Sequence, residues 1–274
     1  MNVASYKIKD IILNSTLPLN ETKILLRHVL NLSAAQLIMY NEQELTSAQY
    51  KEFCYLCNQR INNVPLNYIT GTKEFYSREF KVNNSTLIPR PETEQIVDIV
   101  LAIIAQHKNI KKVLDLGTGS GVIAITIKLE AANLEVVALD KFKETLEIAQ
   151  ANAKRLNAQV KFYLSDWFNC ISEKFDIIVS NPPYIARDDN HLQALVGEPL
   201  SALTDFADGL LHLQHIIVAA PNFMQGNAYL ILEHGYNQGE QIRQIFKNNG
   251  YINIKTYQDI AKLDRITIGE YHAT

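Results

Sequence analysis

Lys112-Val-Leu-Asp-Leu-Gly-Thr-Gly-Ser-Gly121 is the stretch that decides the fold, because an apolar strand-like run ends there in a glycine-rich turn. The turn leads directly into an apolar segment at about 120–131 that has helical periodicity. A strand, a glycine turn and a helix in this order form the first unit of a parallel sheet, and such a turn is suited to hold a nucleotide-like ligand.

The same alternation extends to both sides of this stretch. A helix is predicted from Glu92 to about 107, and helices also over 143–157, 209–223 and 239–249; strands are predicted over 135–140, 160–166, 175–180, 228–233, 251–257 and 264–271. Alternating strands and helices predict a doubly wound, mostly parallel sheet of the Rossmann-like α/β class. Only Gln258 to Leu263 separate the last two strands, which is too short for a parallel crossover. The seven-stranded sheet should therefore contain a reversed last strand.

The first 70 or so residues show helical periodicity alone. Asn20, Ser33 and Thr46 are the expected helix caps in this part. Residues 73–90 read as a short β-hairpin that ends in the stiff Ile88-Pro-Arg-Pro segment. The expected organisation is a small all-α domain at 1–72, a β-hairpin linker at 73–90 and the α/β domain at 91–274.

Composition excludes several classes of protein. Hydrophobic residues make up 47% and charged residues 20%, as in an ordinary globular protein. A net charge of −3 argues against binding of free nucleic acid through phosphate contacts. No apolar run reaches the roughly 18 residues of a membrane span, and the N-terminus lacks the apolar core of a secretory signal. A cytoplasmic protein is expected. Cys54 and Cys57 lie in a predicted helix without further ligands nearby, so no metal is expected.

A ligand site is predicted at the glycine turn. Gly117 and Gly119 allow close approach of a ligand to the backbone, and the following helix adds N–H donors and positive potential. Asp140 ends the second strand, where a carboxylate can accept the two hydroxyls of a ribose. Asp166 and Trp167 end the third strand and are placed to flank an adenine. We therefore expect a nucleoside to bind here. The alternative is a tight turn beside a surface aspartate without a ligand, which would have the same sequence pattern.

A second site is predicted where the fourth strand ends, at Asn181-Pro-Pro-Tyr184. Two consecutive prolines form a stiff corner that can continue neither strand nor helix. The Asn181 side-chain oxygen and the Pro182 carbonyl can accept both N–H bonds of a planar NH2 group, while Tyr184 stacks on its face. A proline turn without function is the plainer reading of this motif alone. Both sites lie at carboxyl ends of strands, so their ligands should meet, which favours methyl transfer to nitrogen over hydride transfer.

These motifs resemble the S-adenosylmethionine methyltransferases, and within them the HemK/PrmC class of glutamine-N5 methyltransferases that modify peptide chain release factors. The segments that carry the resemblance over nearly the whole chain include Leu87-Ile-Pro-Arg-Pro-Glu-Thr-Glu94, Asp115 to Gly121, Ser165-Asp-Trp-Phe168, Ser180-Asn-Pro-Pro-Tyr-Ile185, Glu198-Pro-Leu-Ser-Ala-Leu203 and Leu232-Glu-His-Gly235. The pair Val196-Gly197 departs from the bulkier or charged residues expected in this family.

The resemblance implies S-adenosylmethionine as methyl donor and the glutamine of the GGQ motif of class 1 release factors as acceptor. The implied cofactor-binding residues are Asp115, Gly117, Thr118, Gly119, Ser120, Gly121, Asp140, Asp166, Trp167 and Asn181. Asn181, Pro182 and Tyr184 are the implied catalytic residues, and Pro183, Arg90 and Glu92 join them in substrate binding. Residues 1–72 are expected to bind the release factor.

Three other interpretations remain at this point. A nucleic-acid amino-methyltransferase, acting on adenine N6 or guanine N2, would use the same Asn-Pro-Pro-Tyr corner. A ribosomal-protein glutamine methyltransferase is similar but typically carries Pro-Arg-Ser-Pro where this chain has Pro89-Arg-Pro-Glu92. A non-catalytic nucleoside-binding module would keep the glycine turn without needing the corner.

Overall fold

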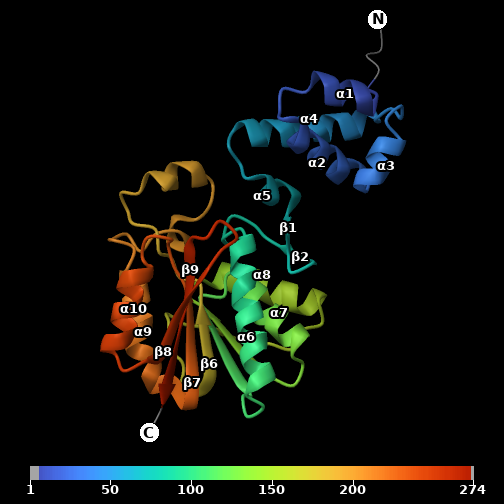
Figure 1. Cartoon of the computed structure of the whole chain (residues 1–274). Helices are drawn as coiled ribbons and strands as arrows, with labels where there is room; N and C mark the ends of the chain where they lie inside the picture. Colours follow the sequence, from blue (N-terminus) through green and yellow to red (C-terminus); the bar gives the residue numbers. More distant parts are fainter. Residues whose placement is uncertain (1–5, 273–274) are drawn as a thin grey trace, which may run out of the picture. The chain divides into compact units, whose positions relative to one another are not determined.

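The computed structural model describes residues 6–272 of the chain, which divides into two compact units, Met1–Gly71 and Thr72–Thr274 (Figure 1). Each unit has its own hydrophobic core. Within residues 6–272, none of the helices is at once long and apolar enough to span a bilayer.

The first unit is entirely helical, and its helices are α1 (Ile8–Asn14), α2 (Leu19–Leu30), α3 (Ala34–Met39), α4 (Ser47–Ile61) and α5 (Leu66–Thr70). Ser33 and Thr46 cap α3 and α4 as predicted, each within a capping box whose partner side chain comes from a glutamine three residues later. The prediction for Asn20 is wrong. Helix α2 begins at Leu19 with Pro18 as its N-cap, so Asn20 already lies inside the first turn.

The core of this unit is formed by one face of each long helix. Leu25 and Leu26 of α2 pack with Phe53 and Leu56 of α4, and Ile8 of α1 joins them. These five side chains are all buried. The helical unit therefore has an apolar interior of its own.

The second unit is built on a seven-stranded sheet with the strands β3 (Lys112–Leu116), β4 (Glu135–Asp140), β5 (Lys161–Leu164), β6 (Phe175–Ser180), β7 (Met224–Glu233), β8 (Ile252–Gln258) and β9 (Asp264–His272). Their order across the sheet is β5-β4-β3-β6-β7-β9-β8. The neighbours from β5 to β7 run parallel, whereas β9 is antiparallel to both β7 and β8. The predicted sheet with a reversed last strand is confirmed.

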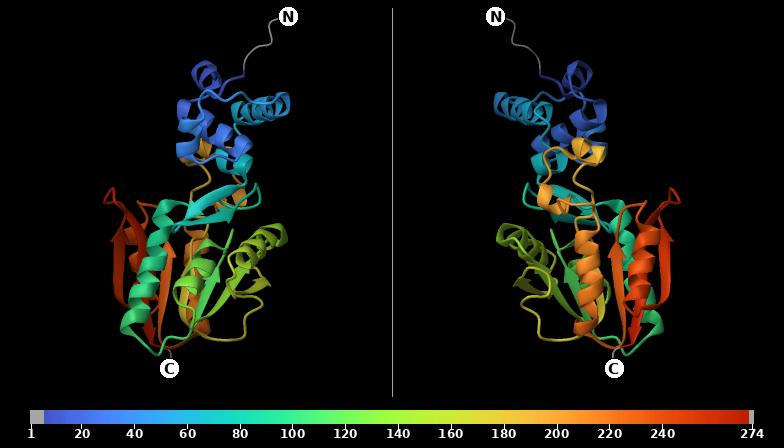
Figure 2. Two further views of the ribbon diagram at one scale, coloured as in Figure 1. Left: turned by 90° about the vertical axis from the view of Figure 1, so that its right-hand side faces the viewer. Right: turned by 90° about the vertical axis from the view of Figure 1, so that its left-hand side faces the viewer.

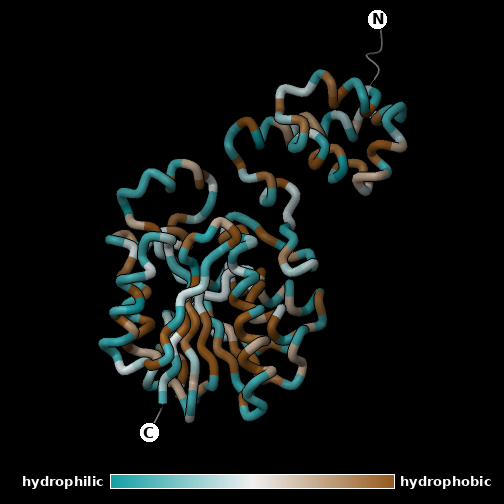
Figure 3. Tube along the Cα trace, viewed as in Figure 1, coloured by the Kyte–Doolittle hydropathy of each residue, from teal (hydrophilic) through white to brown (hydrophobic). Residues whose placement is uncertain are grey.

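Helices cover both faces of this sheet (Figure 2). The cores place α6 (Glu94–Gln106), α7 (Val122–Glu130) and α8 (Lys143–Arg155) on one face and α9 (Leu211–Ala219) and α10 (Gly239–Asn248) on the other. Within β3, Val113 belongs to the first core and Leu114 to the second, because successive side chains of a strand point to opposite faces. The central strands are consequently mostly apolar, as the brown colour along much of their length in Figure 3 shows.

The hairpin β1 (Thr72–Phe75) and β2 (Arg78–Lys81) belongs to this second unit. Its Phe75 and Phe80 are buried in the core beside α6 and α7. The buried side chain of Asn152 accepts from the backbone N–H of Lys81 and donates to its carbonyl and to that of Ser120. The hairpin is thereby fixed to the glycine turn. Short 3-10 helices complete the unit at Pro91–Thr93, Asn190–Leu195, Leu200–Ala202 and Ala220–Phe223.

Candidate active site

The two sequence motifs meet at the centre of the sheet. Strands β3 and β6 are neighbours, and Leu116 at the end of one pairs with Ser180 at the end of the other. The Ser180 hydroxyl donates to the Leu116 carbonyl at 2.7 Å and holds the two ends together. From β3 the chain proceeds to β4 on one side, and from β6 to β7 on the other. Such a reversal of strand order opens a crevice at the carboxyl ends, where ligands of this class of sheet bind.

A cavity of about 300 Å³ occupies this crevice, a size that suits a small molecule. Both motifs and the loops around them contribute to its lining, which consists of Ser85, Leu87, Pro89, Arg90, Thr93, Gly117, Thr118, Gly119, Ser120, Val122, Ile123, Asp140, Lys141, Phe142, Thr145, Ser165, Asp166, Trp167, Asn181, Pro183, Ser201, Ala202, Thr204, Asp205, Phe206 and His212. One cavity thus joins the predicted nucleoside site to the predicted site for a substrate nitrogen.

The glycine turn is shaped by a buried carboxyl group. Asp115 is fully buried and its Oδ2 accepts from the Thr118 hydroxyl at 2.6 Å and from the Ala124 N–H at 3.3 Å. Burial raises the pKa of Asp115 to about 7. Gly117 lines the cavity with a φ of 68°, a conformation that other residues adopt only with strain. Asp115 itself lies behind the cavity lining and shapes the turn.

Gly121 is required for packing between helices. With a φ of 83°, it precedes α7, and a Cβ atom there would lie 2.7 Å from Ile125 and 3.2 Å from Ala149 of α8. Gly121 is likewise absent from the cavity lining, although its neighbour Ser120 belongs to it.

Asp140 places a buried carboxylate on the cavity wall. Its Oδ2 accepts from the Gly119 N–H and its Oδ1 from the Phe142 N–H, both at 3.0 Å. Burial raises the pKa of Asp140, while these backbone donors oppose the shift. Each carboxylate oxygen can still accept a second hydrogen bond. The arrangement can therefore accept the two hydroxyls of a ribose.

Trp167 and Asp166 line the next part of the wall. The Trp167 ring lies 5.2 Å from the ring of His212, which α9 contributes, and Asp166 forms an ion pair with Lys141 at 2.9 Å. Burial lowers the pKa of His212, so its ring is neutral at physiological pH. The sequence alone does not indicate His212 or Phe142 as site residues, because neither belongs to a motif. For Phe142 the one available signal is its position two residues after Asp140.

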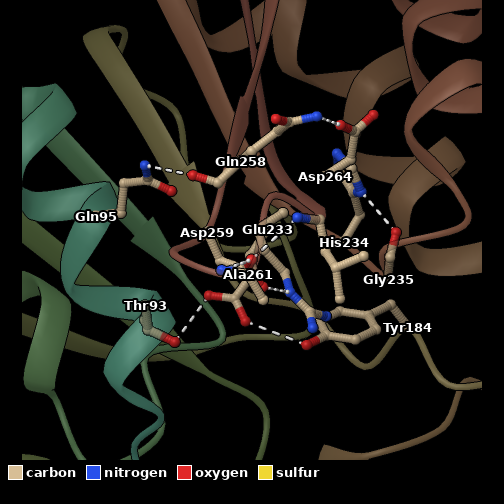
Figure 4. Close-up of polar contacts among 12 residues, drawn as sticks. Thr93, Gln95, Tyr184, Glu233, His234, Gly235, Gln258, Asp259, Ala261 and Asp264 are labelled. Atoms are coloured by element: carbon tan, nitrogen blue, oxygen red, sulfur yellow. Dashed lines mark hydrogen bonds and ion pairs between the residues drawn. The ribbon is translucent and has the colours of Figure 1, made fainter.

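The Asn-Pro-Pro-Tyr corner divides between the cavity and the interior. Asn181 and Pro183 line the cavity, whereas Pro182 and Tyr184 do not. The Asn181 side chain donates from Nδ2 to the Thr93 hydroxyl at 3.2 Å. The Tyr184 hydroxyl donates to Glu233 Oε1 at 3.2 Å (Figure 4), and burial raises the pKa of Tyr184. The Tyr184 ring packs against the core on the α9 and α10 face.

The buried side chain of Gln238 also holds this corner. The Gln238 side chain donates to the Tyr184 carbonyl at 3.0 Å and to the Gly209 carbonyl at 3.1 Å, and it accepts from the Gly235 N–H. Gly209 approaches so closely that a Cβ atom there would lie 2.4 Å from the Tyr184 carbonyl oxygen. The loop after the corner is thereby fixed against the start of α10.

The predicted rim residues Arg90 and Glu92 lie in different places. Arg90 lines the cavity and forms an ion pair with Glu198 at 2.5 Å. Glu92 is half-buried and does not belong to the lining.

The contacts of His234 indicate a structural role. Its Nδ1 lies 2.9 Å from the Gly235 carbonyl and its Nε2 2.8 Å from the Thr267 hydroxyl, and burial lowers its pKa. Both ring nitrogens of this buried, neutral imidazole are occupied, and Figure 4 shows the contact with Gly235. Among residues 6–272, no group of three or more His, Cys, Asp or Glu side chains is arranged to hold a metal ion.

Comparisons with known proteins agree with this geometry. Residues 94–205 match the family model "Methyltransferase small domain", and residues 13–71 match "PrmC N-terminal domain". A crystal structure of a methyltransferase from Pyrococcus furiosus shares the fold, with a TM-score of 0.54 and 16% identity over 78% of this chain and 96% of that chain.

Two curated relatives are similar over nearly their full length. The release factor glutamine methyltransferase of Neisseria gonorrhoeae is 40% identical over 262 residues, covering 94% of this chain and 95% of the relative. That of Escherichia coli is 36% identical over 259 residues, covering 93% of both. This chain belongs to the release factor glutamine methyltransferase family.

Proposed function

We propose that this protein transfers a methyl group from S-adenosylmethionine to the side-chain amide nitrogen (N5) of a glutamine in a peptide chain release factor. One observation carries the proposal beyond family membership. Asn181 lines the same cavity as the glycine turn, and its NH2 group is already engaged by Thr93. Its carbonyl oxygen therefore remains as the acceptor for a substrate N–H.

The cavity wall fits the methyl donor. Gly117 and Gly119 expose backbone to the cavity, Asp140 offers carboxylate oxygens for a ribose, and Trp167 offers an aromatic surface for an adenine. The residues Asp115 and Gly121 act behind them by shaping the turn. When bound, S-adenosylmethionine supplies an electron-poor methyl group on a sulfonium.

The acceptor needs help because an amide nitrogen is a poor nucleophile. Its lone pair is delocalised into the carbonyl group, and this conjugation gives amides a rotation barrier of ~18–20 kcal/mol. In our proposal the Asn181 side-chain oxygen and the Pro182 carbonyl accept the two N–H bonds and aim the face of the nitrogen. A fixed hydrogen bond in a dry site is worth roughly 3–4 kcal/mol toward the transition state. Tyr184 supports the corner from behind the cavity, because its hydroxyl donates to Glu233 and its ring packs against the core.

No general base is required before attack, because the nitrogen becomes acidic only as its new bond to carbon forms and then releases one proton to solvent. The contacts of His234 support this proposal, because its two ring nitrogens are occupied by Gly235 and Thr267. Binding, orientation and exclusion of water are then the tasks of the protein.

The protein substrate also needs recognition away from the reacting nitrogen. We assign this task to residues 1–72, which carry a compact helical core of their own. Release factors act in translation, so the proposed site of action is the cytoplasm.

The test is incubation of the full-length protein with S-adenosylmethionine labelled in its methyl group, a purified class 1 release factor, and DNA and RNA in separate reactions. The proposal predicts one labelled glutamine in the release factor. Label on an exocyclic amine of a nucleic acid, or no label on the release factor, would refute it.

A further inference from the structure

A line of buried and partly buried polar side chains extends from the cavity into the interior of the second unit. Asn181 Nδ2 donates to Thr93 Oγ1 at 3.2 Å, and Thr93 Oγ1 donates to Glu233 Oε2 at 2.8 Å. The second carboxylate oxygen, Oε1, accepts from the Tyr184 hydroxyl at 3.2 Å. In Figure 4 the Glu233 carboxylate lies between Thr93 and Tyr184, which approach it from opposite sides. Three separate segments, namely the 3-10 helix Pro91–Thr93 and the ends of β6 and β7, converge here.

The protons of this line can be assigned by counting donors and acceptors. An ionised carboxylate only accepts, and a threonine hydroxyl has one proton to give. Because Thr93 gives its proton to Glu233, its oxygen can only accept from Asn181. The NH2 group of Asn181 must then face Thr93, and its carbonyl oxygen Oδ1 must face the other way. An ionised Glu233 thus determines the orientation of an amide that it does not touch.

We infer that Glu233 and Thr93 are positioning residues that hold the Asn181 amide with its oxygen, and not its NH2 group, toward the substrate. This inference rests on the proposed function and extends it to substrate selection. A glutamine amide donates to Asn181 Oδ1, whereas a glutamate carboxylate would place two acceptors against each other. A reversed Asn181 would instead oppose its own NH2 to that of the glutamine, and methyl transfer would slow.

The charge of Glu233 sets the direction of the line. Glu233 is 1% exposed, and burial raises its pKa to about 7. The groups that face it are the donors Thr93 and Tyr184, the cationic Arg265 on β9, and Glu92 on the 3-10 helix; the first three lower its pKa and Glu92 raises it. His234, the residue directly after the end of β7, has a pKa that burial lowers, so it is neutral.

Protonation gives Glu233 a proton to donate, and Thr93 is then free to donate to Asn181 instead. Turnover at saturating methyl donor and release factor should therefore fall as Glu233 gains a proton below about pH 7. Asp115, whose pKa burial also raises to about 7, shapes the glycine turn and would act on affinity for the methyl donor. Measurement at saturation separates these two groups.

The experiment compares Thr93→Val, which has the same shape without the hydroxyl, with Thr93→Ser, which retains it. Thr126→Val is the matched control, because Thr126 is fully buried and its hydroxyl has no hydrogen-bond partner among the described residues. We expect kcat to fall at least ~10-fold in Thr93→Val, because the acceptor is misdirected, with most of the loss restored in Thr93→Ser. S-adenosylmethionine affinity by calorimetry should stay within about twofold in all three variants. Wild-type kcat in Thr93→Val, or an equal loss in Thr93→Ser, would overturn the inference.

A second measurement remains decisive if Thr93→Val does not fold. The pH dependence of kcat is compared between the wild type and Glu233→Gln from about pH 5.5 to about pH 9. The wild type should lose activity below about pH 7, and the variant should show lower kcat without that acid limb. An acid limb that persists unchanged in Glu233→Gln would overturn the inference. Failure of the wild type itself to methylate a release factor would refute the proposed function instead.

Discussion

The guanidinium of Arg90 lies 2.5 Å from the carboxylate of Glu198, and the same carboxylate accepts the backbone N–H of Ile88 at 3.0 Å. The Glu198 side chain is only 5% exposed, whereas that of Arg90 is 31% exposed. Arg90 lines the cavity from one side, and Ser201 and Ala202, just after Glu198, line it from another. This contact therefore joins two walls of the site.

Replacement of Glu198 should loosen those walls. Glu198→Ala leaves the Ile88 N–H and the partly exposed Arg90 without their acceptor, so we expect a loss of roughly 1–2 kcal/mol in the free energy of unfolding. We expect kcat/KM for a release factor to fall about tenfold, which corresponds to about 1.4 kcal/mol. Urea unfolding and steady-state kinetics measure the two effects. Glu198→Gln retains an acceptor for Ile88 and should lose less; equal kinetics of Glu198→Ala and wild type would contradict the role.

Asn181 should matter for turnover more than for binding of the methyl donor. Asn181→Ala removes the proposed acceptor of the substrate N–H, so kcat should fall at least ~100-fold. Affinity for S-adenosylmethionine should change by less than about 1.4 kcal/mol, or tenfold. Single-turnover methylation and calorimetry give these quantities. Near-normal turnover would mean that another group holds the substrate amide.

The glycine turn should select S-adenosylmethionine over NAD, because it departs from the GxGxxG pattern that holds the pyrophosphate of dinucleotides. Asp140→Ala should weaken binding of S-adenosylmethionine at least ~10-fold, since it removes the ribose acceptor and the partner of the Gly119 N–H. Calorimetry with both ligands is the measurement. Tighter binding of NAD than of S-adenosylmethionine would exclude the assigned methyl donor.

The buried carboxyl of Glu233 should also affect stability. Its pKa of about 7 in the folded protein exceeds the ordinary value of 4.5, so the folded state binds the proton more tightly than the unfolded chain. Its contribution to stability is complete below about pH 4.5 and is lost as the pH rises through about 7. Glu233→Gln cannot ionise and does not lose this contribution. As the pH rises from about 4.5 to above 7, the free energy of unfolding of the variant minus that of the wild type should therefore increase, by about 3 kcal/mol at most. Unfolding curves at several pH values test this, and a pH-independent difference would refute it.

The helical unit should act in recognition of the protein substrate. A protein that begins at residue 73 retains every residue that lines the cavity, so S-adenosylmethionine affinity should stay within several-fold of wild type. Methylation of an intact release factor should be lost. A truncated protein that binds the methyl donor and methylates the release factor at the full-length rate would show that residues 1–72 have no recognition role.

The sequence alone predicts those parts of the molecule that local interactions determine. Apolar runs with period two or 3.6 specified the strands and helices of the second unit, and strand ends followed by glycine or proline motifs indicated one shared crevice. Ser33 and Thr46 were predictable as caps because their capping-box partners are three residues away. The prediction of Asn20 as a cap is wrong because the helix begins earlier, at Leu19, directly after Pro18.

Contacts between distant parts of the chain could not be predicted in this way. Thr93 and Glu233 are 140 residues apart, and no local pattern pairs a hydroxyl on a 3-10 helix with a carboxylate at the end of β7. The inward position of the Tyr184 hydroxyl likewise depends on that carboxylate. His212 reaches the cavity only because α9 packs beside Trp167. Such side chains acquire their partners from the packing of the sheet and its helices.

The most direct test of the central claim is to locate the transferred methyl group by mass spectrometry after reaction of the full-length protein with S-adenosylmethionine and a purified class 1 release factor. We expect a single modified residue, the glutamine of the GGQ motif, methylated on its side-chain nitrogen. We also expect this modification to disappear with Asn181→Ala. A methyl group on any other type of residue, or an unmodified release factor beside methylated nucleic acid, would contradict the proposed function.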